Sequence, residues 1–131
     1  DPKEAFLDRD LSKLGDTLAN LIYSLALSRA KGAPDGSKVS NKVLSHSLSS
    51  AGLRGLAPSR VDSHRLGDVA EAIIAYAWLE NGLEVEEAAD VLTRSLKKAN
   101  LDRRKETREA AKEGFTSLLK LISDRVEIER A

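Results

Sequence analysis

The sequence predicts an all-α protein, a helical bundle, from its composition and from the spacing of its apolar residues. Apolar residues make up 41% of the chain and aromatic residues only 4%, so the core must be built mainly from aliphatic side chains and alanine. Alanine and leucine are strong helix formers, whereas runs of β-branched residues, which favour strands, are scarce. No stretch of useful length alternates apolar and polar residues as a half-buried strand does.

The first half of the chain contains two segments with helical spacing. Residues 11–30 have an apolar stripe that repeats every three or four positions, which is typical of a helix with one buried face. A turn-rich loop with glycine and proline follows at residues 31–36. Residues 40–51 then predict a shorter helix, which ends at a glycine- and proline-containing break at residues 52–58.

The second half contains three further helical segments. Residues 66–79 are apolar almost all round, and this pattern predicts the central, buried helix of the bundle. After the Asn-Gly turn at residues 81–82, residues 85–99 form an amphipathic helix. A weaker break at residues 100–102 precedes a long helix over residues 103–129, whose apolar stripe covers either this core or a partner subunit.

Length and composition exclude several classes of protein. At 131 residues the chain predicts one domain, 1–131, with one core. Cysteine is absent and only two histidines are present, which excludes disulfides, thiolate sites and an all-histidine zinc site. The net charge is zero, so any binding of nucleic acid must depend on local basic patches. No membrane-spanning run or secretory signal is visible, which predicts a cytoplasmic protein, and the absence of methionine predicts a missing or processed start.

The most informative residues are acids on helices that are otherwise apolar. Residues 66–79 contain two charged side chains, Asp68 and Glu71, and residues 14–27 contain one, Asp16. Asp68 and Glu71 are three positions apart and therefore share a helix face. A buried carboxylate is costly unless a cation or hydrogen-bond donors compensate its charge.

Both acidic segments contain the tripeptide Leu-Gly-Asp, which includes Gly15 in one and Gly67 in the other. Because glycine has no side chain, two helices can approach closely at these positions. If they cross there, Asp16, Asp68 and Glu71 converge, and three carboxylates completed by water are a typical shell for Mg²⁺. The alternative is that Asp16 and Asp68 only cap their helices or stabilise the helix dipoles from the first turn. The sequence leaves both interpretations open.

The acidic segments resemble the two motifs of the ribonuclease III family. Residues 14–18, Leu-Gly-Asp-Thr-Leu, are similar to the signature of that family, and residues 68–79, which begin Asp-Val-Ala-Glu-Ala, are similar to its second acidic helix. Residues 39–44 and the Gly-Leu pair at 52–53 resemble the connecting helix and its end. The resemblance covers about residues 11–92, and the short chain is similar to stand-alone ribonuclease III-like proteins of archaea and bacteria that have no double-stranded-RNA-binding domain.

This resemblance implies a helical endonuclease domain that acts as a homodimer. Its expected activity is Mg²⁺- or Mn²⁺-dependent hydrolysis of phosphodiester bonds in double-stranded or structured RNA. Carried over position by position, Asp16, Asp68 and Glu71 fall on metal-binding, catalytic acids of the family. A catalytically weak or inactive ribonuclease III-like dimer that binds RNA or a protein is the alternative, and a helical scaffold without a nucleic-acid role is a third possibility.

The sequence departs from the family pattern at three positions. A family glutamate one helical turn before the signature aspartate is replaced by Ser12, and an apolar residue of the family dimer interface is replaced by Lys13. A further acid of the connecting helix aligns with His46. The loss of ligands puts catalysis in doubt more than it does the fold. Residues that can substitute from the preceding turn are Glu4, Asp8 and Asp10.

Several basic residues lie near the acidic motifs in the sequence. Those expected to contact RNA phosphates are Lys38, Lys42, His64 and Arg65. Each of them can equally be an ordinary solvated surface residue. A catalytic triad from Asp62, Ser63 and His64 is rejected, because adjacent residues do not point at one another in the required way.

Overall fold

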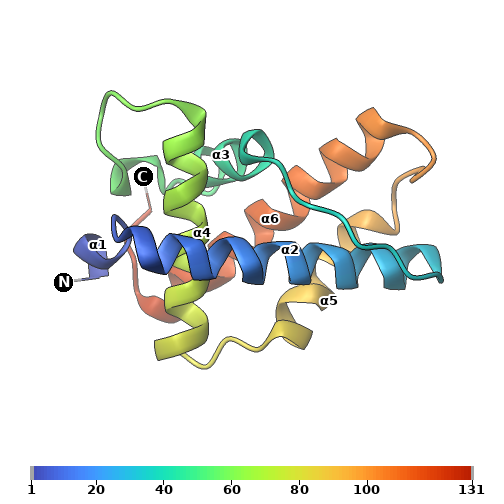
Figure 1. Cartoon of the computed structure of the whole chain (residues 1–131), viewed down its shortest axis with the longest axis horizontal. Coiled ribbons are helices and arrows are strands. Elements are labelled where there is room, and N and C mark those ends of the chain that lie inside the picture. Colours follow the sequence, from blue (N-terminus) through green and yellow to red (C-terminus); the bar gives the residue numbers. More distant parts are fainter. Residues whose placement is uncertain (1, 131) are drawn as a thin grey trace.

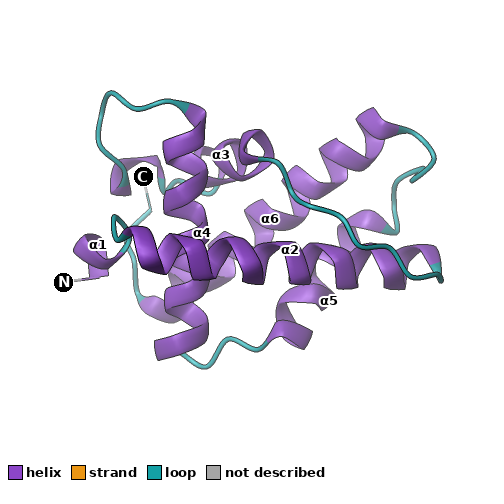
Figure 2. Ribbon diagram, viewed as in Figure 1, coloured by secondary structure: helices purple, strands orange, loops and turns teal. Residues whose placement is uncertain are grey.

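The computed structural model describes residues 2–130, which form six α-helices and one short 3-10 helix without any strand (Figures 1 and 2). The predicted all-α fold is therefore confirmed. In chain order the elements are α1 (Pro2–Ala5), α2 (Arg9–Lys31), α3 (Asn41–Ser50), the 3-10 helix η1 (Arg54–Leu56), α4 (Ser63–Glu80), α5 (Val85–Leu96) and α6 (Arg104–Val126). None of the helices in the described part is both long and apolar enough to cross a membrane.

Helix α4 is the centre of the bundle, as its apolar sequence predicts. Seven consecutive residues, from Val69 to Ala75, are buried, and α2, α3 and α6 all pack against this helix. Helix α2 crosses α4 and also contacts α5, while α6 supports α3 and α5 from the far side (Figure 1). The core is mainly aliphatic and contains few aromatic side chains. One of them, Phe115, is fully buried and packs against the ring of Tyr23.

The helices begin earlier or end sooner than the apolar pattern alone suggests, because polar caps set their ends. Helix α2 starts at Arg9, since the carboxylate of Asp8 accepts a hydrogen bond from the amide of Leu11 at 2.9 Å. In the same way Asp62 accepts from the amide of Arg65, so α4 starts at Ser63. Helix α5 ends at Leu96, three residues before its predicted end.

Helix α6 ends at Val126 rather than at residue 129. Glu127 adopts a left-handed conformation with φ of 60° and closes the last turn, because its amide donates to the carbonyl oxygens of Ser123 and Asp124. The two shortest elements, α1 and η1, were not predicted, since neither is long enough to show a periodic pattern.

The connection from α2 to α3 matters most for the functional site. After Gly32, residues 33–40 form no regular element and run back along α2 as an extended segment, which we call the strap (Figure 1). The strap ends at Ser40, whose hydroxyl accepts a hydrogen bond from the amide of Val43 and caps α3. It therefore fixes where α3 begins relative to α2 and α4.

Candidate active site

The site begins with an unusually close crossing of α2 and α4. A Cβ atom placed on Gly15 would lie 1.8 Å from the carbonyl oxygen of Glu71, so only glycine allows this approach. The predicted crossing at the first Leu-Gly-Asp sequence is confirmed. It places Asp16, the next residue of α2, beside the side chain of Glu71 on α4.

The second Leu-Gly-Asp sequence has a different role from the first. The space beside Gly67 is filled by the side chain of Asn41, whose Cγ and Oδ1 would lie 3.0 Å from an added Cβ. The missing side chain of Gly67 therefore allows close packing of the start of α3, not of α2. The repeated tripeptide does not mark two equivalent faces of one crossing.

The three acids differ greatly in their exposure to solvent. Glu71 is only 4% exposed, Asp68 has a side chain that is 27% exposed, and Asp16 is exposed. Burial, a hydrogen bond with Asp16 and the negative charges of Asp16 and Asp68 raise the pKa of Glu71 to about 9. In the absence of a cation, the pair of Asp16 and Glu71 therefore holds a proton at neutral pH.

The helix-capping alternative does not account for these acids. Asp16 is the eighth residue of α2 and Asp68 the sixth of α4, so both lie beyond the first turn, and the caps are Asp8 and Asp62. Capping therefore does not explain why these two carboxylates lie beside Glu71. The negative charges of Asp16 and Asp68 instead raise the free energy needed to ionise the buried carboxyl of Glu71.

The chemistry of these donors fits a divalent cation bound by oxygen. A buried carboxyl and a neighbouring carboxylate, with a third acid in electrostatic reach, repel one another when ionised, and a cation relieves this repulsion. Within residues 2–130, no three acids or histidines stand in ready metal-binding geometry. In the described residues the two carboxyl groups in direct contact are those of Asp16 and Glu71, and Asp68 does not complete a preformed three-ligand site with them.

Asp68 has a neighbour that the sequence did not reveal as part of the same group. His64 Nε2 lies 3.9 Å from Asp68 Oδ2, and His64 Nδ1 lies 2.5 Å from the side-chain nitrogen of Asn41. Because an amide nitrogen can only donate, Nδ1 accepts and Nε2 carries the ring proton that faces Asp68. His64 thus links the start of α3 to the acidic helix.

Neither Ser12 nor the suggested substitutes supply the missing family acid. Ser12 is buried, and its hydroxyl donates to the carbonyl of Arg9 at 3.3 Å. Asp8 is engaged as the cap of α2, about 12 Å along the helix from Asp16. Glu4 and Asp10 are exposed and are not among the groups that act on Glu71.

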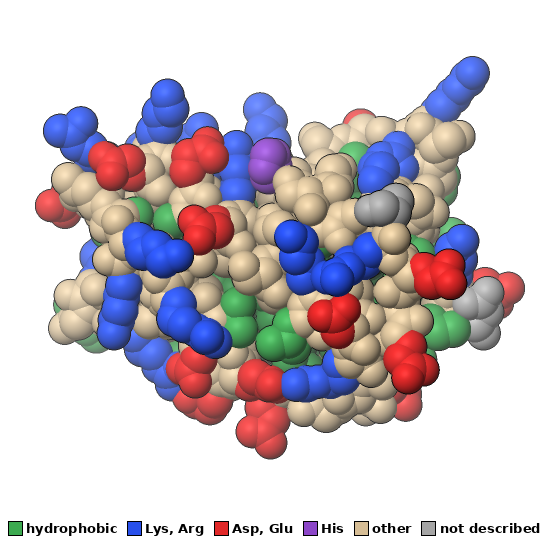
Figure 3. All heavy atoms as spheres, turned by 180° about the vertical axis from the view of Figure 1, so that it is seen from behind, with side chains coloured by type: hydrophobic (Ala, Val, Ile, Leu, Met, Phe, Trp, Pro, Cys, Tyr) green, Lys and Arg blue, Asp and Glu red, His purple; other side chains and the backbone are tan. Residues whose placement is uncertain are grey.

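The basic residues expected to bind RNA differ in exposure, and all of them adjoin residues of the site along the chain. Lys38 and Lys42 are exposed, as is His64, whereas Arg65 is half-buried. Each is a chain neighbour of a residue connected to the acids: Lys38 precedes Val39 on the strap, and Lys42 follows Asn41. The face of the molecule seen in Figure 3 has acidic and basic side chains interspersed, which agrees with the zero net charge.

Sequence reasoning missed Asn20, which contacts the acidic pair directly. The side-chain nitrogen of Asn20 donates to Oδ1 of Asp16 at 3.2 Å, while its oxygen accepts from the amide of Val39 at 2.9 Å. A signal was available, because Asn20, Ser24 and Ser28 form a polar stripe at four-residue spacing on an otherwise apolar part of α2. The role of this stripe becomes clear only from the position of the strap, whose backbone amides donate to these three side chains.

Comparison with known proteins identifies the family to which this helical domain belongs. The family model described as Ribonuclease III matches residues 9–128, which is nearly the whole chain and extends well beyond the region in which the motifs are visible. No curated protein matches the chain.

Proposed function

Because the chain belongs to the ribonuclease III family, we propose that it is a metal-dependent endoribonuclease that hydrolyses phosphodiester bonds in double-stranded or structured RNA. Family membership implies cleavage of RNA of the ribonuclease III type. The observation that carries the proposal for this chain is the contact between Asp16 and Glu71 at the crossing of α2 and α4, with Asp68 one turn away.

The proposed cofactor is Mg²⁺ or Mn²⁺, held by Asp16 and Glu71 with support from Asp68. A cation held by these residues would orient and help to deprotonate the attacking water and would compensate charge on the leaving oxygen. Glu71 provides a fixed, buried oxygen donor, and Asp16 provides a donor at the solvent-exposed edge. Asp68, with His64 Nε2 3.9 Å away, adds a third negative charge on the side of α3.

The proposed RNA contacts come from the basic residues that adjoin this site along the chain. Lys38, Lys42, His64 and Arg65 would contact phosphates, which is how double-stranded RNA is mostly bound, since side chains recognise its shape and backbone. Because the whole chain has no net charge, these local contacts supply the electrostatic attraction, and binding should weaken steeply with salt.

The proposed assembly is a homodimer. Leu21, Trp78 and Leu79 are 42–52% exposed, and Leu21 shares a face of α2 with Leu14, seven residues earlier. Leu79 and Leu14 also line one shallow hollow beside the start of α2. We expect light scattering to give a dimeric mass for the wild-type protein and a monomeric mass for the double variant Leu21→Lys, Leu79→Lys; a monomeric wild type would contradict the proposal.

The decisive experiment is cleavage of duplex RNA by purified protein with Mg²⁺ or Mn²⁺, compared with Glu71→Gln. We expect this variant to lose at least about 100-fold in rate, since loss of a mere outer partner of a metal ligand already costs about 10- to 100-fold. The matched control is Glu80→Gln, the same change on an exposed acid of α4, which should cut like the wild type. Equal cutting by wild type and Glu71→Gln would sink the proposal.

One observation favours the second candidate, a ribonuclease III-like dimer that binds RNA or a protein without cutting. Ser12 stands where the family has an acid, and its hydroxyl donates to a backbone carbonyl instead of facing a cation. Salt-dependent binding of duplex RNA, with no cleavage in either metal, would support this candidate and exclude the first.

A further inference from the structure

We infer that Asn20 is a positioning residue that holds the Asp16 carboxylate in place, and that the strap in turn holds Asn20. The inference rests on the proposed function in one respect only, namely that Asp16 binds a cation. It concerns a residue outside the acidic motifs and a loop without secondary structure.

The strap is fastened to α2 by a regular series of hydrogen bonds. The amides of Asp35, Ser37 and Val39 donate to side-chain oxygens of Ser28, Ser24 and Asn20, each at 2.9 Å. These donors alternate along the strap, and the acceptors are spaced by one helical turn along α2. Two residues of extended chain span about 6.6 Å and four residues of helix about 6 Å, so the two repeats match.

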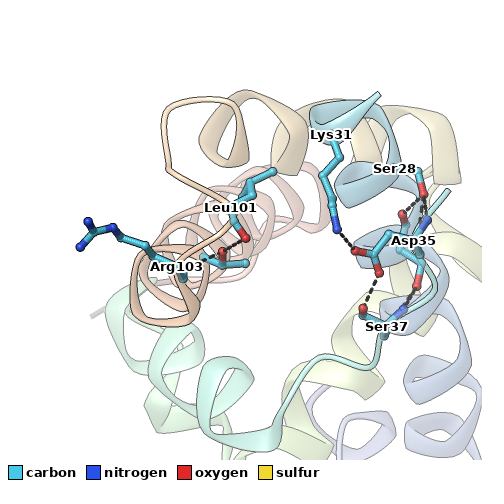
Figure 4. A network of polar contacts seen from close by, with 8 residues as sticks. Ser28, Lys31, Asp35, Ser37, Leu101 and Arg103 are labelled. Atoms are coloured by element: carbon cyan, nitrogen blue, oxygen red, sulfur yellow. Dashed lines mark hydrogen bonds and ion pairs between the residues drawn. The ribbon is translucent and has the colours of Figure 1, made fainter. Parts of the chain in front are cut away.

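Further contacts fix the far end of the strap (Figure 4). The hydroxyl of Ser24 donates back to the carbonyl of Ser37 at 2.8 Å, whereas the single proton of the Ser28 hydroxyl is shared between the carbonyls of Ser24 at 2.8 Å and Asp35 at 3.2 Å. The carboxylate of Asp35 accepts from Lys31 at 2.7 Å and from the hydroxyl of Ser37 at 2.6 Å. The segment is therefore held along its length rather than at one point.

Asn20 differs from the two serines because it uses both ends of its side chain. Its oxygen belongs to the strap series, whereas its nitrogen donates to Asp16 Oδ1. The bond from Val39 fixes which end of the amide is the oxygen, and it thereby aims the amide nitrogen at Asp16. Asp16 is exposed, and within the described part of the chain its carboxylate is restrained by this hydrogen bond and by its contact with Glu71.

The same segment approaches the site from its other side. Directly after the strap, Asn41 lies beside Gly67 and contacts His64, which faces Asp68. A single connection thus supports Asp16 through Asn20 and comes near Asp68 through Asn41 and His64.

The structure offers two variants that separate support of the strap from support of Asp16. In Asn20→Ser, the new hydroxyl can accept from Val39 just as Ser24 accepts from Ser37, but it is too short to reach Asp16. In Ser24→Ala, two hydrogen bonds of the strap are lost, while the contact between Asn20 and Asp16 remains.

Binding of Mn²⁺ alone, measured by titration calorimetry, and the melting temperature test the inference. We expect Asn20→Ser to bind Mn²⁺ about 10- to 100-fold more weakly at nearly unchanged melting temperature, as for other outer partners of metal ligands. Ser24→Ala should melt at a lower temperature but bind Mn²⁺ within about twofold of the wild type. Wild-type affinity in Asn20→Ser, or an equal loss in both variants, would overturn the inference.

A metal-free measurement keeps this test separate from the proposed function. In the presence of a chelator, NMR three-bond couplings of Asp16 should indicate one χ1 rotamer in the wild type and in Ser24→Ala, and averaging in Asn20→Ser. If the wild type binds no Mn²⁺, the proposed nuclease is wrong, yet these couplings still decide whether Asn20 positions Asp16. Identical couplings in all three proteins would overturn the inference.

Discussion

Gly15 of α2 rests directly on the carbonyl oxygen of Glu71 in α4, with no side chain between the two backbones. This contact brings the buried carboxyl of Glu71 to Asp16, which follows Gly15 in the chain. The acidic pair therefore depends on the absence of a single Cβ atom.

Substitution of Gly15 by alanine tests this dependence. The added Cβ would lie 1.8 Å from backbone that cannot rotate away, so α2 and α4 must separate. We expect Gly15→Ala to lower the free energy of unfolding by at least about 3 kcal/mol, at the upper end of overpacking effects, as measured by urea denaturation. The control is Gly55→Ala, where no atom lies within 4 Å of the added Cβ. A comparable loss of unfolding free energy in that variant would show that the effect of Gly15→Ala does not come from the helix crossing.

The stability of the metal-free protein should fall as pH rises. The pKa of Glu71 is about 9 in the folded protein against an ordinary value of 4.5, so between these values the folded state retains a proton that the unfolded chain has released. Stability that is complete below about pH 4.5 is therefore lost progressively up to about pH 9. Glu71→Gln abolishes this decline, and at pH 8 we expect it to be more stable than the wild type by roughly 1–3 kcal/mol in chemical denaturation. Parallel pH profiles for the two proteins would contradict this assignment.

Cation binding should compete with that proton. Because a carboxyl must be deprotonated to bind a metal, Mn²⁺ binding by the wild type should release protons and become tighter as pH rises. We expect Mn²⁺ to raise the melting temperature more at pH 8 than at pH 5.5, and to leave that of Glu71→Gln unchanged. A shift that is equal at both pH values, or equal in both proteins, would exclude the acidic pair as the binding site.

Restoring an acid at Ser12 should strengthen the site. Ser12 lies one helical turn before Asp16 and is only 9% exposed, so a glutamate there adds a fourth carboxyl group to a crowded, partly buried region. We predict that Ser12→Glu lowers the stability of the metal-free protein by about 1–3 kcal/mol and tightens Mn²⁺ binding by about tenfold. Calorimetry and thermal melts with and without Mn²⁺ measure both effects; unchanged affinity would show that the position does not face the cation.

The sequence by itself determined the five longer helices, α2 to α6, the central position of α4 and the acids that meet beside it. Apolar spacing reveals a buried helix because the water-exposed and core-facing positions alternate with the helical period. Acids on such a helix are visible for the same reason, since they break an otherwise apolar pattern. Asp16 and Glu71 were therefore recognisable before their contact was known.

Only the tertiary structure decided which of these residues touch and what supports them. The two Leu-Gly-Asp sequences look equivalent, yet their glycines have different neighbours. Gly15 contacts the backbone of α4, whereas Gly67 contacts the side chain of Asn41, because the way in which the helices cross decides what lies beside each glycine. Asn20 gains its role from Val39, nineteen residues away, through a strap that has no periodic signal of its own. A side chain that works through a distant backbone amide leaves no pattern in the local sequence, and its function becomes visible only when the chain has folded.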